Sequence, residues 1–72
     1  MKLTKMKWAS YWVAKRELLG ISYNDSYNVA TYGITRDEYM QINKALIDLY
    51  GMERHDINFV SYSKVKKHMD QH

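Results

Sequence analysis

The chain of 72 residues contains no cysteine, no proline and only three glycines. Without cysteine, neither a disulfide framework nor the cysteine-rich ligand sets of structural zinc sites can form. No stretch approaches the ~20 apolar residues that a membrane-spanning helix needs, and lysines interrupt any signal-peptide core near the start. We therefore expect a soluble, cytoplasmic protein that requires no metal or cofactor and does not enter a membrane.

Aromatic residues are plentiful, with seven Tyr and two Trp. A chain this short buries only about 60% of its unfolded surface, so most of the rings must serve as core. We expect residues 1–72 to form a single helical domain. The formal net charge is +3, yet residues 21–56 hold six acidic and three basic side chains. A basic total favours nucleic acid, whereas the acidic middle favours a protein partner with a basic surface.

Hydrophobic periodicity predicts an all-α fold, a small bundle of three main helices plus one short helix. The main helices are expected over residues 4–19, 35–50 and 62–70, and the short helix near 26–32. The middle helix has the strongest signals: Thr35 and Glu38 form a capping box, and Gly51 can end the helix in the left-handed conformation.

Two regions are harder to assign. Residues 57–62 alternate like a strand, but no second strand is evident. We expect a loop or extended piece to about Val60 that leads into the last helix, which Ser61 or Ser63 would cap, and whether residues 57–62 are extended or helical stays open. In the first helix Lys15 shares an arc with Trp8 and Tyr11, so its ammonium is expected to reach outward to solvent.

The opposite side of the first helix carries a second, smaller apolar pair. Met6 and Val13 lie there, away from the aromatic residues. The bundle core does not need to cover them. A homodimer formed through this side is therefore left open as an alternative.

The turn at Gly33 resembles that of helix-turn-helix DNA-binding domains, over about residues 25–46. In this register Val29 packs in the first helix, and Tyr39 and Ile42 anchor the second. The resemblance implies a DNA-binding transcriptional regulator. Its DNA contacts would be the side chains of Arg36, Gln41, Lys44, Lys64, Lys66 and Lys67. Asp37 would face the phosphates at the tip, so a purely structural corner is the competing interpretation.

Tyr, Asn and Ser concentrate just before that turn, the mixture that protein-binding surfaces use. The acidic start of the 35–50 helix follows. The predicted protein contacts are Tyr23, Asn24, Asp25, Tyr27, Asp37 and Glu38. We therefore expect a small binding protein that inhibits or modulates a partner protein, of the phage or mobile-element accessory type that binds a host factor. A nucleic-acid enzyme with a basic groove would match the acidic residues.

No pattern points to catalysis or to a metal. His68 and His72 share a helical spacing, but the second is the last residue, where helices fray. Asp37 and Glu38 suit the dipole at a helix start rather than acid–base chemistry. We expect no catalytic residue, no metal ligand and no enzyme activity.

Overall fold

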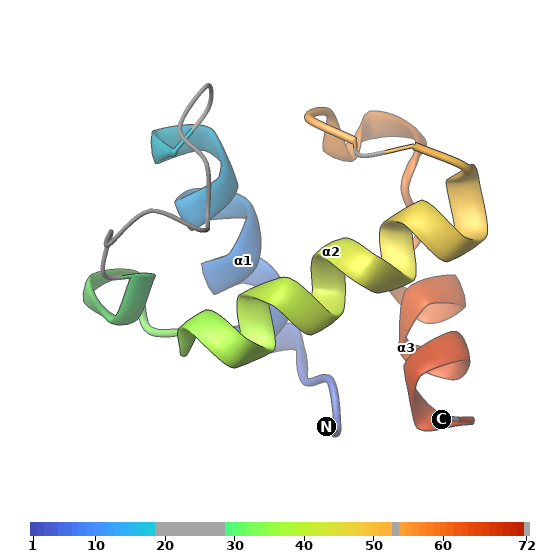
Figure 1. The fold of residues 1–72 in the computed structure, drawn as a ribbon, viewed down its shortest axis with the longest axis horizontal. Helices are drawn as coiled ribbons and strands as arrows, with labels where there is room; N and C mark the ends of the chain where they lie inside the picture. The colour runs from blue at the N-terminus through green and yellow to red at the C-terminus, as the bar shows by residue number, and fades with distance from the viewer. Residues whose placement is uncertain (19–28, 53, 72) are drawn as a thin grey trace.

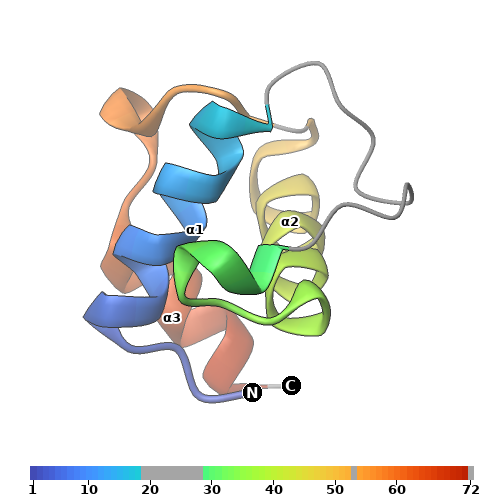
Figure 2. The same cartoon turned by 90° about the vertical axis from the view of Figure 1, so that its left-hand side faces the viewer.

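The computed structural model describes residues 1–18, 29–52 and 54–71, and over these ranges the protein is all-helical (Figure 1). The elements in chain order are α1 (Lys5–Glu17), the 3₁₀ turn η1 (Val29–Tyr32), α2 (Arg36–Tyr50), the 3₁₀ turn η2 (Ile57–Phe59) and α3 (Tyr62–Asp70). This confirms the predicted small bundle of three main helices plus a short one. The start of the chain and the end of α3 lie on the same side of the molecule (Figure 2).

Helix α2 begins and ends at the predicted signals. The Thr35 side chain accepts from the Glu38 backbone N–H at 3.1 Å, and the Glu38 carboxylate accepts from the Thr35 N–H at 3.0 Å. At the far end Gly51 has a φ of 74° and donates its N–H to Ile47. Both ends were predictable because each signal lies within a few residues of the end that it fixes.

Helix α1 begins as predicted and ends earlier. Thr4 caps it by accepting from the Lys7 N–H at 3.2 Å. The helix ends at Glu17 with Leu18 as its capping residue, whereas the periodicity predicted an end at Leu19. Gly20, the expected helix stop, lies outside the described residues.

The connection to α3 answers a question that the sequence left open. Ser61 caps α3 by accepting from the Lys64 N–H, as predicted. Residues 57–59, which were expected in a loop or extended piece, form the turn η2. Asp56 caps that turn by accepting from the Asn58 N–H at 2.8 Å, and the Val60 N–H closes it on the Ile57 carbonyl at 3.0 Å. These local hydrogen bonds give the segment what a partner strand would otherwise supply.

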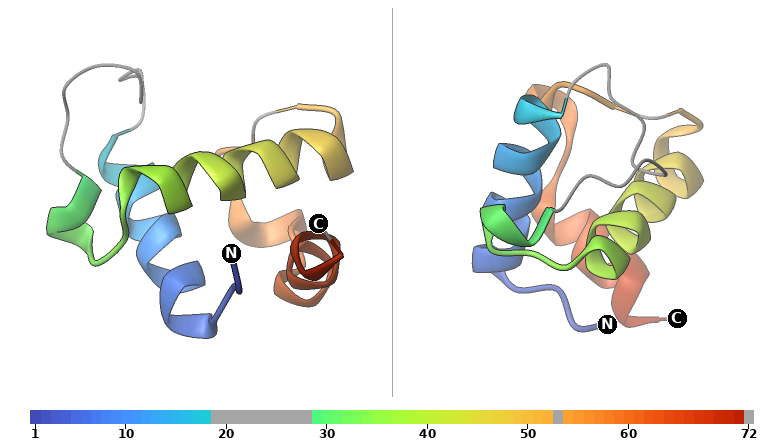
Figure 3. Two further views of the ribbon diagram at one scale, coloured as in Figure 1. Left: turned by 60° about the horizontal axis from the view of Figure 1, so that its bottom comes forward. Right: turned by 60° about the vertical axis from the view of Figure 1, so that its left-hand side comes forward.

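Aromatic rings join the three helices. The ring of Trp8 on α1 lies 5.6 Å edge-on from Trp12 and 5.7 Å from Tyr62 on α3. Tyr11, also on α1, lies 5.0 Å from Tyr39 on α2. Figure 3 shows α1 against the earlier part of α2 and α3 against its later part. Aromatic contacts therefore join α1 to both other helices, within a core whose remaining buried side chains are mostly aliphatic.

Lys15 is buried rather than exposed. Its side chain is only 3% exposed, and its Nζ lies 3.2 Å from Oδ1 of Asn43 on α2. The same oxygen accepts a hydrogen bond from the Tyr11 hydroxyl. The prediction that the ammonium reaches solvent was wrong, because a helix far along the chain offers it an acceptor inside the protein. The Nδ2 of Asn43 is also buried, and it finds no hydrogen-bond partner among the residues that the structure describes.

Candidate protein-interaction surface

The corner before α2 packs as the helix-turn-helix register predicted. Val29, Tyr39 and Ile42 are all buried in the core. Gly33 turns the chain with a φ of 87° and donates its N–H to Ala30 at 3.0 Å. In the part that the structure describes, however, the element before the corner is the single 3₁₀ turn η1. The geometry therefore confirms a packed corner. Small helical bundles use such corners whether or not they bind DNA.

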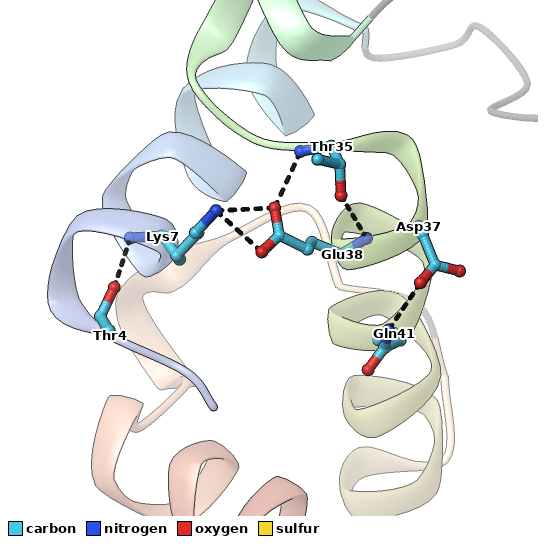
Figure 4. A network of polar contacts seen from close by, with 6 residues as sticks. All are labelled: Thr4, Lys7, Thr35, Asp37, Glu38 and Gln41. Atoms are coloured by element: carbon cyan, nitrogen blue, oxygen red, sulfur yellow. Dashed lines mark hydrogen bonds and ion pairs between the residues drawn. The ribbon is translucent and has the colours of Figure 1, made fainter. Parts of the chain in front are cut away.

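The predicted acidic contacts lie at the start of α2, and each has a partner inside the protein (Figure 4). Glu38 forms an ion pair with Lys7 of α1, with Nζ and a carboxylate oxygen 2.8 Å apart. Asp37 is exposed, and its Oδ2 accepts from Gln41 Nε2 at 2.9 Å. The two carboxylates point to opposite sides of the helix start, Glu38 toward Lys7 and Asp37 toward Gln41, so each is tied to a different side chain (Figure 4). The remaining predicted protein contacts, Tyr23, Asn24, Asp25 and Tyr27, lie outside the described residues.

The hydrogen bond from Lys7 lowers the pKa of Glu38, and the Thr35 backbone N–H lowers it further. Partial burial of the carboxyl acts in the opposite direction and is outweighed. Glu38 is therefore ionised at neutral pH, and its charge is neutralised across the α1–α2 contact. The Glu38 carboxylate therefore serves mainly to join α1 and α2, and its charge is less available to a partner protein.

The predicted DNA contacts on α2 have unequal access. Arg36 and Lys44 are exposed, but Gln41 donates to Asp37. The capping box engages the Thr35 and Glu38 N–H groups, and amides at a helix start are what would otherwise bind a phosphate. Two of the N–H groups at the helix start are therefore already engaged by acceptors from the chain itself.

The three lysines of α3 do not point the same way. Lys66 donates to the Leu3 carbonyl at 3.3 Å and pairs with Asp70 at 3.0 Å. Lys64 lies over the Tyr50 ring of α2, with Nζ 4.9 Å from the centroid. Only Lys64 and Lys67 are exposed. A continuous row of phosphate-binding lysines is therefore not formed along this helix.

An open groove of about 290 Å³ lies between α2 and α3. Its lining residues are Met1, Gln41, Lys44, Ala45, Asp48, His68 and Met69. Across it His68 Nε2 lies 3.4 Å from Asp48 Oδ2. No group of three or more His, Cys, Asp or Glu side chains among the described residues could hold a metal ion. The predicted partner of His68, His72, lies outside them.

The surface that sequence reasoning missed lies at the end of α2 and the connection that follows it. Four large apolar side chains are exposed there, and we call them the 47–59 patch: Ile47, Met52, Ile57 and Phe59. Phe59 is 74% exposed and the other three are 45–57% exposed. The guanidinium carbon of Arg54 lies 5.8 Å from the centroid of the Phe59 ring.

One sequence signal could have identified this patch. Phe59 is the single phenylalanine of the chain, and it lies before the last helix, whose Tyr62, Val65 and Met69 pack into the core. An aromatic residue that precedes a helix, instead of lying within its apolar face, is a candidate contact residue.

A second exposed apolar site is the predicted outer side of α1. Met6 is 79% exposed and Val13 is 40% exposed, which confirms that the core leaves both uncovered. They are two residues on one short helix. Their apolar area is far below that of a stable dimer interface, which buries about 1,200–2,000 Å².

No family model matches the chain, and no curated protein or solved structure is significantly similar to it. Among the described residues, none of the helices has both the length and the apolar character to cross a membrane. What the protein binds has therefore to be inferred from its own surface.

Proposed function

We propose that the protein is a small non-enzymatic binding protein that attaches to a partner protein and modulates it, with the 47–59 patch as its contact. The observation that carries this proposal is the exposed ring of Phe59 beside the Arg54 guanidinium. Aromatic residues, Met and Arg are the types enriched at the centres of protein interfaces. A few such anchors supply most of the binding energy.

The segment that carries Phe59 is held in place by hydrogen bonds on both sides. Asp56 caps η2 before the ring, and the Ser61 N–H donates to the Tyr50 hydroxyl at 3.2 Å after it. A side chain on a fixed backbone loses less conformational entropy on binding than one on a loose loop. An exposed aromatic residue on a pre-formed turn is therefore suited to binding.

The DNA-binding regulator is a second candidate, favoured by the exposed Arg36 and Lys44 on the outer side of α2. Against it, Asp37 and Asp48 are exposed on the same helix and would repel phosphates. The partner with a basic surface, predicted from the acidic residues, also stays a prediction. We favour the 47–59 patch because its four apolar side chains are exposed and are not among the residues that form the described core.

The test is affinity capture from cell lysate with and without nuclease, comparing three baits. The first is the unchanged protein, the second carries Ile57→Ser and Phe59→Ser, and the third carries Met6→Ser and Val13→Ser. The third matches the second in kind, because it also removes two exposed apolar side chains. We expect a stoichiometric protein that resists nuclease and is lost only from the second bait.

Two other outcomes would contradict the proposal. A protein that all three baits retain equally would place the contact away from the 47–59 patch. Nucleic acid that is recovered by the unchanged protein, and lost with Arg36→Glu and Lys44→Glu, would instead support the DNA-binding regulator.

A further inference from the structure

The open groove between α2 and α3, which we call the α2–α3 groove, has one wall that α2 forms alone. Gln41, Lys44, Ala45 and Asp48 line it. These positions are three and four residues apart, so they lie on one face of the helix and follow one another along about 10 Å of its axis. The wall is therefore one continuous surface.

Opposite charges lie one turn apart on this wall. Lys44 and Asp48 are both exposed, and they do not pair with each other in the part of the chain that the structure describes. The order of the two residues is consistent with this, because a basic residue four positions before an acidic one is the weaker arrangement on a helix. Their Cβ atoms are about 5–6 Å apart at this spacing, so a small ligand can bridge the two charges.

The deeper lining of the groove is apolar. Ala45 and Met69 are buried and belong to the core, and Met1 also lines the groove. His68 of α3 faces Asp48, with Nε2 3.4 Å from Oδ2. That contact is long for a hydrogen bond, and a carboxylate offers about four acceptor positions, so Asp48 keeps acceptor capacity toward the groove.

We infer that the α2–α3 groove binds a free α-amino acid with an apolar side chain. Its carboxylate pairs with Lys44, its ammonium pairs with Asp48, and its side chain lies on Ala45 and Met69. The two charges of the ligand match the two charges of the wall, so neither side is left with an unpaired charge. The groove shares no residue with the 47–59 patch, and this inference does not depend on the proposed function.

The size of the groove limits the ligand. Its volume of about 290 Å³ lies at the lower end of the ~300–1,000 Å³ of ligand pockets. This suits one amino acid and is small for a nucleotide cofactor. A peptide is also a poor match, because its terminal ammonium and carboxylate lie at opposite ends of the chain, whereas Lys44 and Asp48 are one turn apart.

The test is a titration of the isotope-labelled full chain with leucine, followed by NMR of the backbone amides. Two analogues keep the shape of leucine: isocaproate lacks only the ammonium, and isoamylamine lacks only the carboxylate. We expect leucine to shift the amide signals of Lys44, Ala45, Asp48 and Met69, with a Kd on the order of 1 mM. Each analogue should bind at least about threefold more weakly.

Two variants should remove this selectivity in opposite directions. With Lys44→Met, leucine and isoamylamine should bind equally, and with Asp48→Asn, leucine and isocaproate should bind equally. A variant that only disturbed the shape of the groove would weaken all three ligands together. The matched controls Lys5→Met and Glu17→Gln remove the same charges from exposed positions of α1, so the Kd for leucine should stay within about twofold.

Three outcomes would overturn the inference. Leucine, methionine and phenylalanine could all leave the amide signals unmoved at about 30 mM, which would exclude an amino-acid site. Either analogue could bind as tightly as leucine, which would reduce the site to one charge. Shifts outside the groove would place the ligand elsewhere. The protein contact is tested separately, with Ile57→Ser and Phe59→Ser, so each proposal can fail without the other.

Discussion

Asn43 shows how a single buried amide organises the contact between α1 and α2. Its oxygen accepts from both Tyr11 and Lys15, so Asn43→Ala would leave two buried donors without that acceptor, one of them charged. We expect the free energy of unfolding to fall by on the order of 3 kcal/mol in urea denaturation. The exposed neighbour gives the control: Lys44→Ala should change it by less than about 0.5 kcal/mol. Equal effects of the two changes would contradict a structural role for the amide.

Glu38 should make the stability depend on pH in the acid range. Its pKa in the folded protein lies below its ordinary value of 4.5, so the unfolded chain takes up a proton first. The stabilisation is present above pH 4.5 and is lost as the pH falls through the lower folded pKa. Urea denaturation across this range should show a weaker pH dependence for Glu38→Gln than for the unchanged protein.

The control for that experiment is Lys7→Met, which removes the larger cause of the shift and keeps the hydrogen bond from Thr35. Its pH dependence should fall between those of the unchanged protein and Glu38→Gln. A profile identical to that of the unchanged protein would mean that the ion pair is not what holds the Glu38 pKa down.

At the scale of elements, the corner between η1 and α2 depends on Gly33 more than the end of α2 depends on Gly51. Both have positive φ, where a side chain costs roughly 1–2 kcal/mol. A Cβ at Gly33 would also lie 3.1 Å from Ser10 Oγ, whereas one at Gly51 would meet nothing within 4 Å. In thermal denaturation Gly33→Ala should therefore lower the Tm more than Gly51→Ala. Adding Ser10→Ala should recover the difference, and no recovery would assign the whole cost to the backbone.

The sequence separation between a residue and its partner determines which features could be predicted. Both ends of α2 follow from signals within a few residues, and so do the capping residues Thr4 and Ser61. The acceptor for Lys15 lies 28 residues further along the chain, so no local pattern could place its ammonium. The exposed ring of Phe59 depends on which helix faces pair, and that too is decided only when the bundle assembles.

At the scale of the whole molecule, α1 and α3 are joined through Trp8. Removing a buried aromatic side chain costs about 3–5 kcal/mol, which is a large share of the stability of a domain this small. We expect Trp8→Ala to lower the Tm steeply, with all three helices melting in one transition by circular dichroism. That single transition is also what the prediction of one domain over residues 1–72 requires.

Phe59→Ala is the matched control, because it removes an aromatic ring that is exposed instead of buried. Its free energy of unfolding should stay within about 0.5 kcal/mol of that of the unchanged protein. If Trp8→Ala instead left α3 folded while α1 melted, the bundle would consist of two independent parts.

Both tryptophans of the chain lie on α1, with their rings in edge-on contact inside the bundle. Their emission therefore reports whether α1 is docked in the bundle. Partner binding at the 47–59 patch calls for a probe on the patch itself, for example a replacement of Phe59 by tryptophan.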